Sequence, residues 1–292
     1  MKPLPQMAII GPGKVGTAIG LLARRAGWPV VAVAGRSHRR AARAARIIGR
    51  GVRACTAAKA AGMAKLVLLT VPDEQIKAVC DGLAAEATFS AGSIVAHCCG
   101  ALSSDILASA RRGGCSVGSM HPLATFPTVQ AAVDKLCGTH CFIEGDRAAV
   151  AVLSRLARAI GGKPVEIPAG AKPLYHAAAV VACNYLASLL DAAVTLCQRT
   201  GIDRRRAWAA LEPLVQATLE NVSLLGPEKA LTGPIARGDA ATIAGHLRAL
   251  GGAGTELMDL YISLGQWTVG LARRKGTLSE SKAAEIRNLL KR

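Results

Sequence analysis

The sequence contains few aromatic residues, three each of Trp, Tyr and Phe among 292 residues. A core without large rings must be filled by Ala, Leu, Val and Ile, which favours closely packed helices over a sandwich of large side chains. A disordered chain is excluded, because 51% of the residues are hydrophobic. The length allows two domains of ordinary size, each with its own core.

Acidic residues are also scarce, with 19 Asp and Glu against 36 Lys and Arg, which gives a net charge of +17. A basic surface can bind nucleic acid by neutralising phosphates. However, the sequence lacks zinc-finger spacing, a basic strand with interleaved aromatics and a recognition-helix pattern. We therefore interpret the charge as a solvated surface rich in Arg and expect no nucleic-acid partner.

The nine cysteines include no C-x-x-C pair, and most of them lie within apolar runs. This pattern predicts reduced, buried thiols rather than a disulfide framework. The clusters His97-Cys98-Cys99 and Cys137 to Cys141 do not match metal-site spacing, so we expect no metal.

Long hydrophobic stretches are also rare, since the sequence contains only one. The apolar run before Gly11 is only four residues long, too short for a signal peptide, so we expect a cytoplasmic protein. Residues 177–197 are long and apolar enough to resemble a membrane span. They contain Asn184 and Asp191 and are rich in Ala, so we predict a buried core helix and no membrane association.

A dinucleotide-binding fingerprint follows the apolar run at residues 7–10. A buried strand that must turn sharply into a helix needs one glycine for the turn, one where backbone approaches a pyrophosphate and one where helix packs on strand. The phosphates then bind free N–H groups at the helix start. An apolar helical segment and a second strand at 29–34 supply the required context. The residues of this turn are Gly11, Pro12, Gly13, Lys14, Val15 and Gly16.

The second strand lacks the acidic residue that usually binds the ribose 2′-hydroxyl of NAD. Gly35 leaves room there, while Arg36 and Ser37 can donate hydrogen bonds to a 2′-phosphate. We therefore predict NADP (NADPH) as the cofactor.

Strand and helix patterns alternate up to residue 167, and only helices follow. We predict an α/β Rossmann domain with a parallel, doubly wound sheet at 1–167, and an all-α domain for substrate binding and dimerisation at 168–292. Asp239 and Ser279 are expected N-caps. Further strands are expected at 66–71, 94–96, 115–120, 141–143 and 164–167, and helices at 147–160, 173–200, 203–225, 239–250, 254–275 and 279–291.

Ligands of parallel sheets bind beyond the carboxyl ends of the strands. Val71 ends the third buried strand and Pro72 follows it, whereas His97 and Gly100 follow the fourth, so we expect all four at the cofactor wall. Each could also be a simple loop start. His121 precedes a proline, which holds its backbone extended and fixes the direction of its ring. It is therefore either a functional residue or a structural one.

Several stretches are familiar in combination: GPGKVG at 11–16, VPD at 71–73, HCCGA at 97–101, SMHPLATF at 119–126, Tyr175-His176 with Asn184, LTGP at 231–234 and RGD at 237–239. Together they resemble a bacterial family of Rossmann-like oxidoreductases with a helical C-terminal domain of unassigned function. That family is similar to pyrroline-5-carboxylate reductase and to the 6-phosphogluconate and 3-hydroxyisobutyrate dehydrogenases. The resemblance implies NAD(P)-dependent redox chemistry and a dimerising helical domain. Cys99 stands where such relatives often carry serine.

Candidate proton donors are few. His176 and Asn184 are eight residues apart, about 80° around a helix and roughly 12 Å along it, so they could line one cleft. Lys172 lies roughly where the related dehydrogenases carry a catalytic lysine. We favour His176 because histidine titrates near neutral pH, with Lys172 and His121 as alternatives. His176 could equally make a buried helix contact.

Substrate contacts are expected from the irregular segment between the later helices. Thr232 and Arg237 lie there, and Arg237 could bind a carboxylate bidentately or pair with Asp239. Two functions remain open: an NADP-dependent oxidoreductase acting on a small carbonyl, imine or hydroxy-acid substrate, and a non-catalytic NADP-binding sensor or partner-binding module. Because 177–197 is too uniformly apolar to face water, we predict a homodimer formed through the C-terminal helices.

Overall fold

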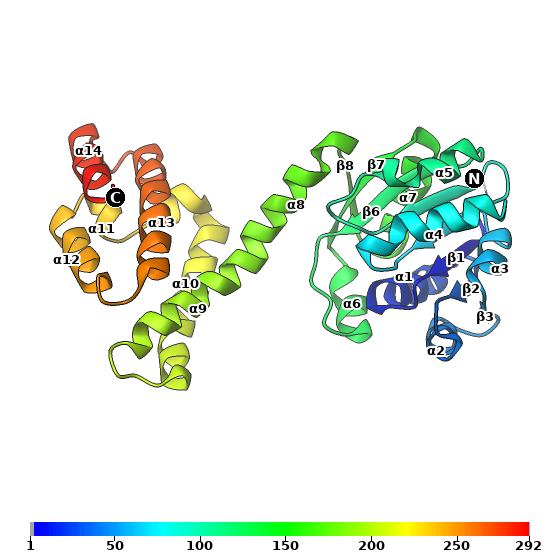
Figure 1. Cartoon of the computed structure of the whole chain (residues 1–292), viewed down its shortest axis with the longest axis horizontal. Helices are drawn as coiled ribbons and strands as arrows, with labels where there is room; N and C mark the ends of the chain where they lie inside the picture. The colour runs from blue at the N-terminus through cyan, green and yellow to red at the C-terminus, as the bar shows by residue number, and fades with distance from the viewer. Residues whose placement is uncertain (1–2, 292) are drawn as a thin grey trace. The chain divides into compact units, whose positions relative to one another are not determined.

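The computed structural model describes residues 3–291 and divides them into two compact units, one ending at Ala182 and one beginning at Cys183. The chain changes from alternating strands and helices to helices alone after Glu166, as expected from the sequence (Figure 1). The division between the units lies further along the chain. The reason is that the first helix after the last strand contacts the sheet through its first two turns.

The first unit is built on one sheet with the order β3-β2-β1-β4-β5-β6-β7-β8. The chain runs outward from β1 in one direction and then, from β4 onward, in the other. The predicted doubly wound α/β fold is therefore confirmed. The strands within residues 3–291 are β1 (Met7–Ile10), β2 (Val30–Ala34), β3 (Arg53–Cys55), β4 (Leu66–Leu69), β5 (Ile94–His97), β6 (Ser116–Pro122), β7 (His140–Gly145) and β8 (Lys163–Glu166).

Two features of the sheet differ from the expected one. The short edge strand β3 lies within an arginine-rich segment and shows no apolar run. All pairings are parallel except that of β6 with β7, which is antiparallel. The connection between these strands does not cross the sheet, because Leu123 N–H donates to His140 O at 2.9 Å and so starts β7 beside the end of β6.

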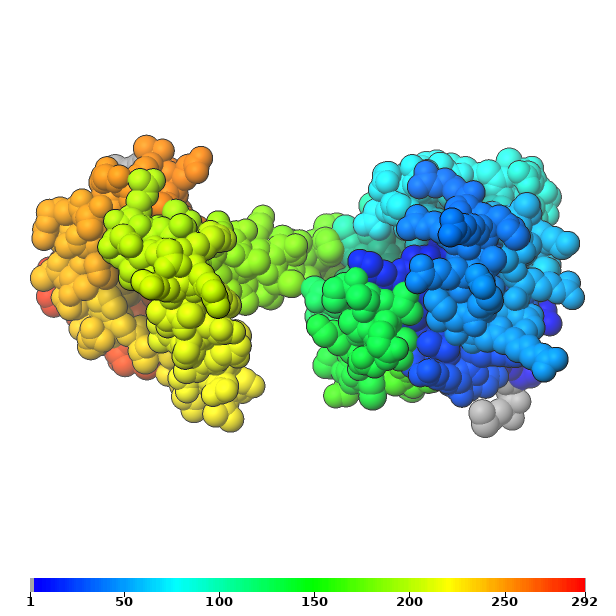
Figure 2. Space-filling model, turned by 90° about the horizontal axis from the view of Figure 1, so that it is seen from below, coloured from blue at the N-terminus to red at the C-terminus, as the bar shows by residue number. Residues whose placement is uncertain are grey.

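Helices cover both faces of the sheet. One face is packed by α1 (Lys14–Arg25), α2 (His38–Ile48), α6 (Val129–Leu136) and α7 (Arg147–Ala159). Figure 2 shows α6, in green, beside α1, in dark blue. The other face is packed by α3 (Ala57–Gly62), α4 (Asp73–Ala85), η1 (Ser104–Leu107) and α5 (Ala108–Arg112). Ala, Val, Ile and Leu side chains fill most of both interfaces, in keeping with the shortage of aromatics.

After the short turn η2 (Ala169–Ala171), α8 (Lys172–Val180) runs into a π-helical turn, η3 (Val181–Tyr185). The second unit continues with α9 (Leu186–Gln198), α10 (Arg204–Ala230), α11 (Pro234–Arg237), α12 (Ala240–Leu250), α13 (Thr255–Lys275) and α14 (Glu280–Leu289). The expected break in α10 is a kink at Gly226. The predicted N-caps are confirmed, because Asp239 accepts from Thr242 N–H and Ser279 from Lys282 N–H.

The prediction of a buried core helix at 177–197 is wrong. Val194 is the one residue of α9 that is buried, whereas Val181 and Tyr185 are about 60% exposed. Residues 169–198 are long and apolar enough to cross a membrane, yet only 6% of their most apolar window is buried. Apolar composition could not distinguish a helix covered by its own chain from one left uncovered.

Candidate active site

The strand order reverses between β1 and β4, where connections leave in opposite directions. A crevice forms at such a point beyond the carboxyl ends of the strands. The segments that follow β1, β4 and β5, together with the end of β6, lie along this edge. Most of the site residues proposed from the sequence are found on these segments.

Two glycines of the fingerprint are required by the fold itself. Gly11 has φ +114°, and a Cβ there would lie 2.5 Å from the backbone of Thr70. A Cβ at Gly16 would lie 2.2 Å from Thr70 Oγ1 and 2.7 Å from Gly11 O. The Thr70 hydroxyl donates to Gly11 O at 2.7 Å and ties the turn to β4.

Gly13 is different, because no protein atom requires a glycine there. Its nearest neighbour is Thr70 O, 4.0 Å from a built Cβ, and its φ of −83° suits any residue. It is exposed and N-caps α1, whose first turn has no acidic residue. The first N–H groups of α1, on Lys14 and Val15, lack helical partners. This bare, electropositive backbone fits the phosphates of a dinucleotide.

The segment after β2 carries the residues predicted to bind a ribose phosphate. A Cβ at Gly35 would lie 2.4 Å from Pro12 Cδ, so Gly35 is required for the proline ring to pack against this strand. Arg36 is exposed and makes no hydrogen bond or ion pair with the residues that the structure describes. Ser37 N-caps α2 and accepts from Arg40 N–H at 3.3 Å. Arg36 is therefore available to an anionic ligand, while the Ser37 oxygen already has one partner.

The side chains expected at the cofactor wall differ in accessibility. Val71 and Pro72 follow β4 and are half-buried and exposed, respectively. His97 is fully buried, and both ring nitrogens are used: Nδ1 accepts from Cys99 N–H at 3.2 Å and Nε2 lies 3.3 Å from Ser103 O. Burial lowers the pKa of His97 to about 4, so the ring is neutral. We assign His97 a structural part in shaping the loop that carries Gly100.

Cys99 takes over the hydrogen bonds expected of a serine. Its thiol donates to the Asp73 carboxylate at 3.0 Å and accepts from Ala101 and Leu102 N–H at 3.3 Å. Burial and the hydrogen bond to Asp73 raise the pKa of Cys99, so it remains a thiol. The thiol thus ties this loop to Asp73 at the start of α4.

Two histidines converge above Gly100. A Cβ at Gly100 would lie 2.6 Å from His176 Nδ1 and 2.9 Å from His121 Cε1. The histidine rings are edge to face, with centroids 6.0 Å apart. His176 Nδ1 is buried without a hydrogen-bond partner among the described residues. Such an orphaned polar atom is costly unless a ligand or water satisfies it.

Tyr175 completes this cluster. Its hydroxyl lies 2.8 Å from His121 Nδ1, and its ring stacks on Phe142 with centroids 4.0 Å apart. Burial lowers the pKa of His121 to about 4, aided by the positive charge of Lys172. Burial also raises the pKa of Tyr175 to about 12. At neutral pH the pair therefore comprises an uncharged ring and a protonated phenol.

Lys172 lies beneath the cluster and is fully buried. Its ammonium group donates to Cys99 O at 2.6 Å and to Ser119 Oγ at 2.8 Å. Ser119 in turn lies 2.5 Å from Glu144 Oε1. Burial lowers the pKa of Lys172, and the charge of Glu144 opposes that effect. A lysine in this state is enclosed by protein and does not reach a ligand directly.

The remaining candidates belong to the second unit. Asn184 is exposed on η3, where the wider π turn alters the 80° relation to His176 calculated for a regular helix. Thr232 lines a cavity of about 300 Å³ that also contains the hydrogen-bonded pair His246 and Tyr261. Arg237 is exposed at the end of α11.

No metal-binding cluster is found among the described residues. Three residues of the site were missed from the sequence: Tyr175, Ser119 and Glu144. Ser119 and Tyr175 belong to stretches that carried the family resemblance. No pattern in the sequence indicated Glu144, because its contact with Ser119 arises from the pairing of β6 with β7.

The fold and site define a two-domain protein: a Rossmann-like domain with a phosphate-binding turn, followed by a helical domain. Family models agree with this description. Residues 2–122 match a Rossmann-like domain, and residues 139–268 match a domain of unknown function (DUF2520). The resemblance inferred from the sequence is thereby confirmed.

Several solved structures share the fold across nearly the whole chain. BF3122 of Bacteroides fragilis, provisionally named an NADP oxidoreductase, is 21% identical with a TM-score of 0.66 over 98% of both chains. Protein TM1727 of Thermotoga maritima is 25% identical with a TM-score of 0.69, over 92% of this chain and 97% of that one. A reductive aminase of Aspergillus terreus, in complex with NADPH and ethyl-5-oxohexanoate, is 17% identical with a TM-score of 0.58, over 99% and 93%. The search of curated proteins gives no match.

Proposed function

We propose that the protein is an NADP-dependent oxidoreductase that transfers a hydride to or from a small carbonyl, imine or hydroxy-acid substrate. The observation that carries the proposal is the presence of two complementary parts on one sheet edge. One is the bare phosphate-binding backbone at Gly13. The other is the cluster of proton-bearing side chains above Gly100. They follow β1 and β5, which are two strand spacings, or about 10 Å, apart.

The cluster supplies the proton donor or acceptor that hydride transfer requires from the protein. A bound nicotinamide cofactor supplies or accepts the hydride at carbon. Reduction of C=O or C=N also consumes one proton at oxygen or nitrogen, and oxidation releases one. His176, with its orphaned Nδ1, and the Tyr175 hydroxyl are the groups on α8 that can donate or accept that proton. Neutral His121 holds the Tyr175 hydroxyl in place.

NADP is proposed over NAD because Arg36 is exposed and unpaired among the described residues, and no carboxylate occupies the end of β2. A charge-assisted hydrogen bond to a 2′-phosphate uses that guanidinium directly. The NADPH bound to the A. terreus reductive aminase supports the same choice. Asn184 remains a catalytic candidate, and Thr232 and Arg237 remain candidates for substrate binding.

We also propose that the chain forms a homodimer through its C-terminal helices. The second unit exposes large apolar side chains on two helices, α10 and α13, and patches of this kind mark interaction sites. Their exposed fractions are 39% for Trp208, 65% for Leu214, 81% for Leu224, 40% for Leu264 and 74% for Trp267. Burial of these side chains by a second copy would remove the exposure that the single chain leaves.

The experiment is steady-state oxidation of NADPH with a panel of keto acids, aldehydes and cyclic imines, run beside a direct titration of NADPH binding. The proposal expects tight NADPH binding and turnover of at least one substrate class. Tight binding without turnover of any compound would instead favour a non-catalytic NADP sensor. Absence of binding would contradict both functions.

A further inference from the structure

The antiparallel pairing of β6 and β7 prepares two adjacent positions on which α8 docks. In this register Ser119 lies opposite Glu144, and His121 lies opposite Phe142. Lys172, at the start of α8, binds the first pair through Ser119. Tyr175, one turn later, binds the second pair through His121 and stacks on Phe142. The helix that carries the proposed proton donors is therefore fixed at one polar and one aromatic contact.

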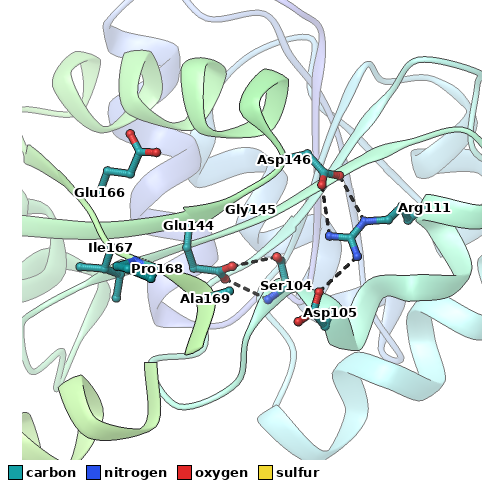
Figure 3. Close-up of a pocket in the computed structure, with 10 residues that line it drawn as sticks. All are labelled: Ser104, Asp105, Arg111, Glu144, Gly145, Asp146, Glu166, Ile167, Pro168 and Ala169. Carbon is teal, nitrogen blue, oxygen red and sulfur yellow. Dashed lines mark hydrogen bonds and ion pairs between the residues drawn. The ribbon is translucent and has the colours of Figure 1, made fainter. Parts of the chain in front are cut away.

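Hydrogen-bond direction defines the charges in the polar contact. The Lys172 ammonium can only donate, so Ser119 Oγ accepts from it and donates its own proton to Glu144 Oε1. Glu144 also accepts from Ser104 N–H at 2.9 Å and from Ser104 Oγ at 2.8 Å (Figure 3). All three partners of this carboxyl group are donors, which suits a carboxylate. Lys172 and Glu144 thus form a buried ion pair bridged by the Ser119 hydroxyl.

Burial makes the two charges depend on each other. Lys172 and Ser119 are 0% exposed, and Glu144 is 1% exposed. A charge taken out of water is costly, and removal of its partner leaves that cost uncompensated. The other titratable groups around Lys172 come from three places: Asp73 at the start of α4, Cys98, Cys99 and His97 at the end of β5, and His121 on β6. Glu144 raises the pKa of Lys172 more than Asp73, Cys98 or Cys99 does.

We propose that Glu144 is a positioning residue. Through Ser119 it keeps Lys172 charged and anchored to the carbonyl of Cys99, and it thereby fixes α8 so that Tyr175 and His176 lie above Gly100. The effect on turnover rests on the proposed oxidoreductase function, whereas the ion pair itself does not.

The pocket beside Glu144 provides a matched control. It has a volume of about 410 Å³ and is lined by Glu144 and by Glu166 of the neighbouring strand β8 (Figure 3). Glu166 is exposed, and Figure 3 draws no interaction from its carboxylate to the residues around the pocket. Glu144→Gln and Glu166→Gln therefore make the same chemical change at the same pocket, with and without the link to Ser119.

The ion pair is tested by titration of lysines labelled with carbon-13 at Cε, followed by NMR, with the Lys172 signal identified by its loss in Lys172→Met. We expect the pKa of Lys172 to fall by about 1–3 in Glu144→Gln, as for loss of a close opposite charge, and to stay at the parent value in Glu166→Gln. An unchanged Lys172 titration in Glu144→Gln overturns the proposal. If Glu144→Gln does not fold, the double variant Lys172→Met/Glu144→Gln decides. It should unfold at a higher denaturant concentration than Lys172→Met alone, because it no longer buries a carboxylate without its partner. A lower midpoint contradicts the ion pair.

The positioning part is tested by kinetics. We expect Glu144→Gln to lower kcat on the order of tenfold to a hundredfold, as for a small misplacement of reacting groups, with NADPH affinity and the activity of Glu166→Gln unchanged. Parent kcat in Glu144→Gln contradicts positioning. A parent chain with no turnover at all contradicts the proposed function instead, and the Lys172 titration still tests the ion pair.

Discussion

Gly100→Ala should reduce turnover strongly. An added Cβ would lie 2.6 Å from His176 Nδ1 and 2.9 Å from His121 Cε1, far inside ordinary contact distance. Ordinary contact begins at 3.4 Å, so the His176 ring must move by about 0.8 Å. Misplacement of a reacting group by about 1 Å can cost on the order of 100-fold in rate. We expect a loss of roughly that size in kcat, because both rings belong to the proton-donating cluster.

The assay is steady-state NADPH oxidation with the best substrate of the panel, with NADPH binding measured by fluorescence titration. Gly82→Ala, in the interior of α4, is the control, since a Cβ there meets no atom within 4 Å. It should keep parent activity and gain slightly in stability, as usual for Gly to Ala in a helix. Parent kcat in Gly100→Ala would refute the placement of the chemistry above Gly100.

Four further predictions follow from the same geometry. Arg36→Ala should bind NADPH roughly 10- to 150-fold more weakly, because a charged hydrogen bond contributes about 1.5–3 kcal/mol. The variant should gain no affinity for NADH. Equal affinities of the parent for both cofactors would show that Arg36 faces solvent. His176→Ala should lower kcat roughly 100-fold with NADPH affinity intact, and unchanged turnover would remove it as general acid. Sedimentation at micromolar concentration should show twice the chain mass, whereas Trp267→Glu should shift the protein toward monomer; a monomeric parent contradicts the dimer. Because the folded-state pKa of His121 is about 4 against an ordinary 6.5, the unfolded chain binds more protons between these values. Thermal stability should therefore fall as pH drops from 6.5 toward 4, and by less in His121→Gln; an equal fall in both would contradict the assignment.

The local parts of the fold could be predicted from sequence. Spacing of Gly11, Gly13 and Gly16 after an apolar run is a short-range signal, and so are the caps at Asp239 and Ser279. Alternation of apolar strands and amphipathic helices likewise predicted the Rossmann-like domain. These signals operate within a few residues of the element that they define.

The rest depends on contacts between distant parts of the chain. Lys172 and Ser119 are 53 residues apart, and Ser119 and Glu144 are 25 residues apart. No local sequence pattern therefore predicts that they form hydrogen bonds with one another. The packing of Pro12 against Gly35 is equally non-local. It means that an acidic residue cannot be introduced at Gly35 to favour NADH without displacing the proline ring.

The most direct test of the account is transfer of deuterium from NADPH deuterated at the reactive C4 position of its nicotinamide. Products from the panel of carbonyl and imine compounds would be analysed by mass spectrometry. The account predicts one deuterium in the reduced product, retained at carbon, and a strongly reduced yield with Gly100→Ala. Conversion without deuterium in the product, or no conversion of any compound by a parent chain that binds NADPH tightly, would contradict hydride transfer as the function of this site.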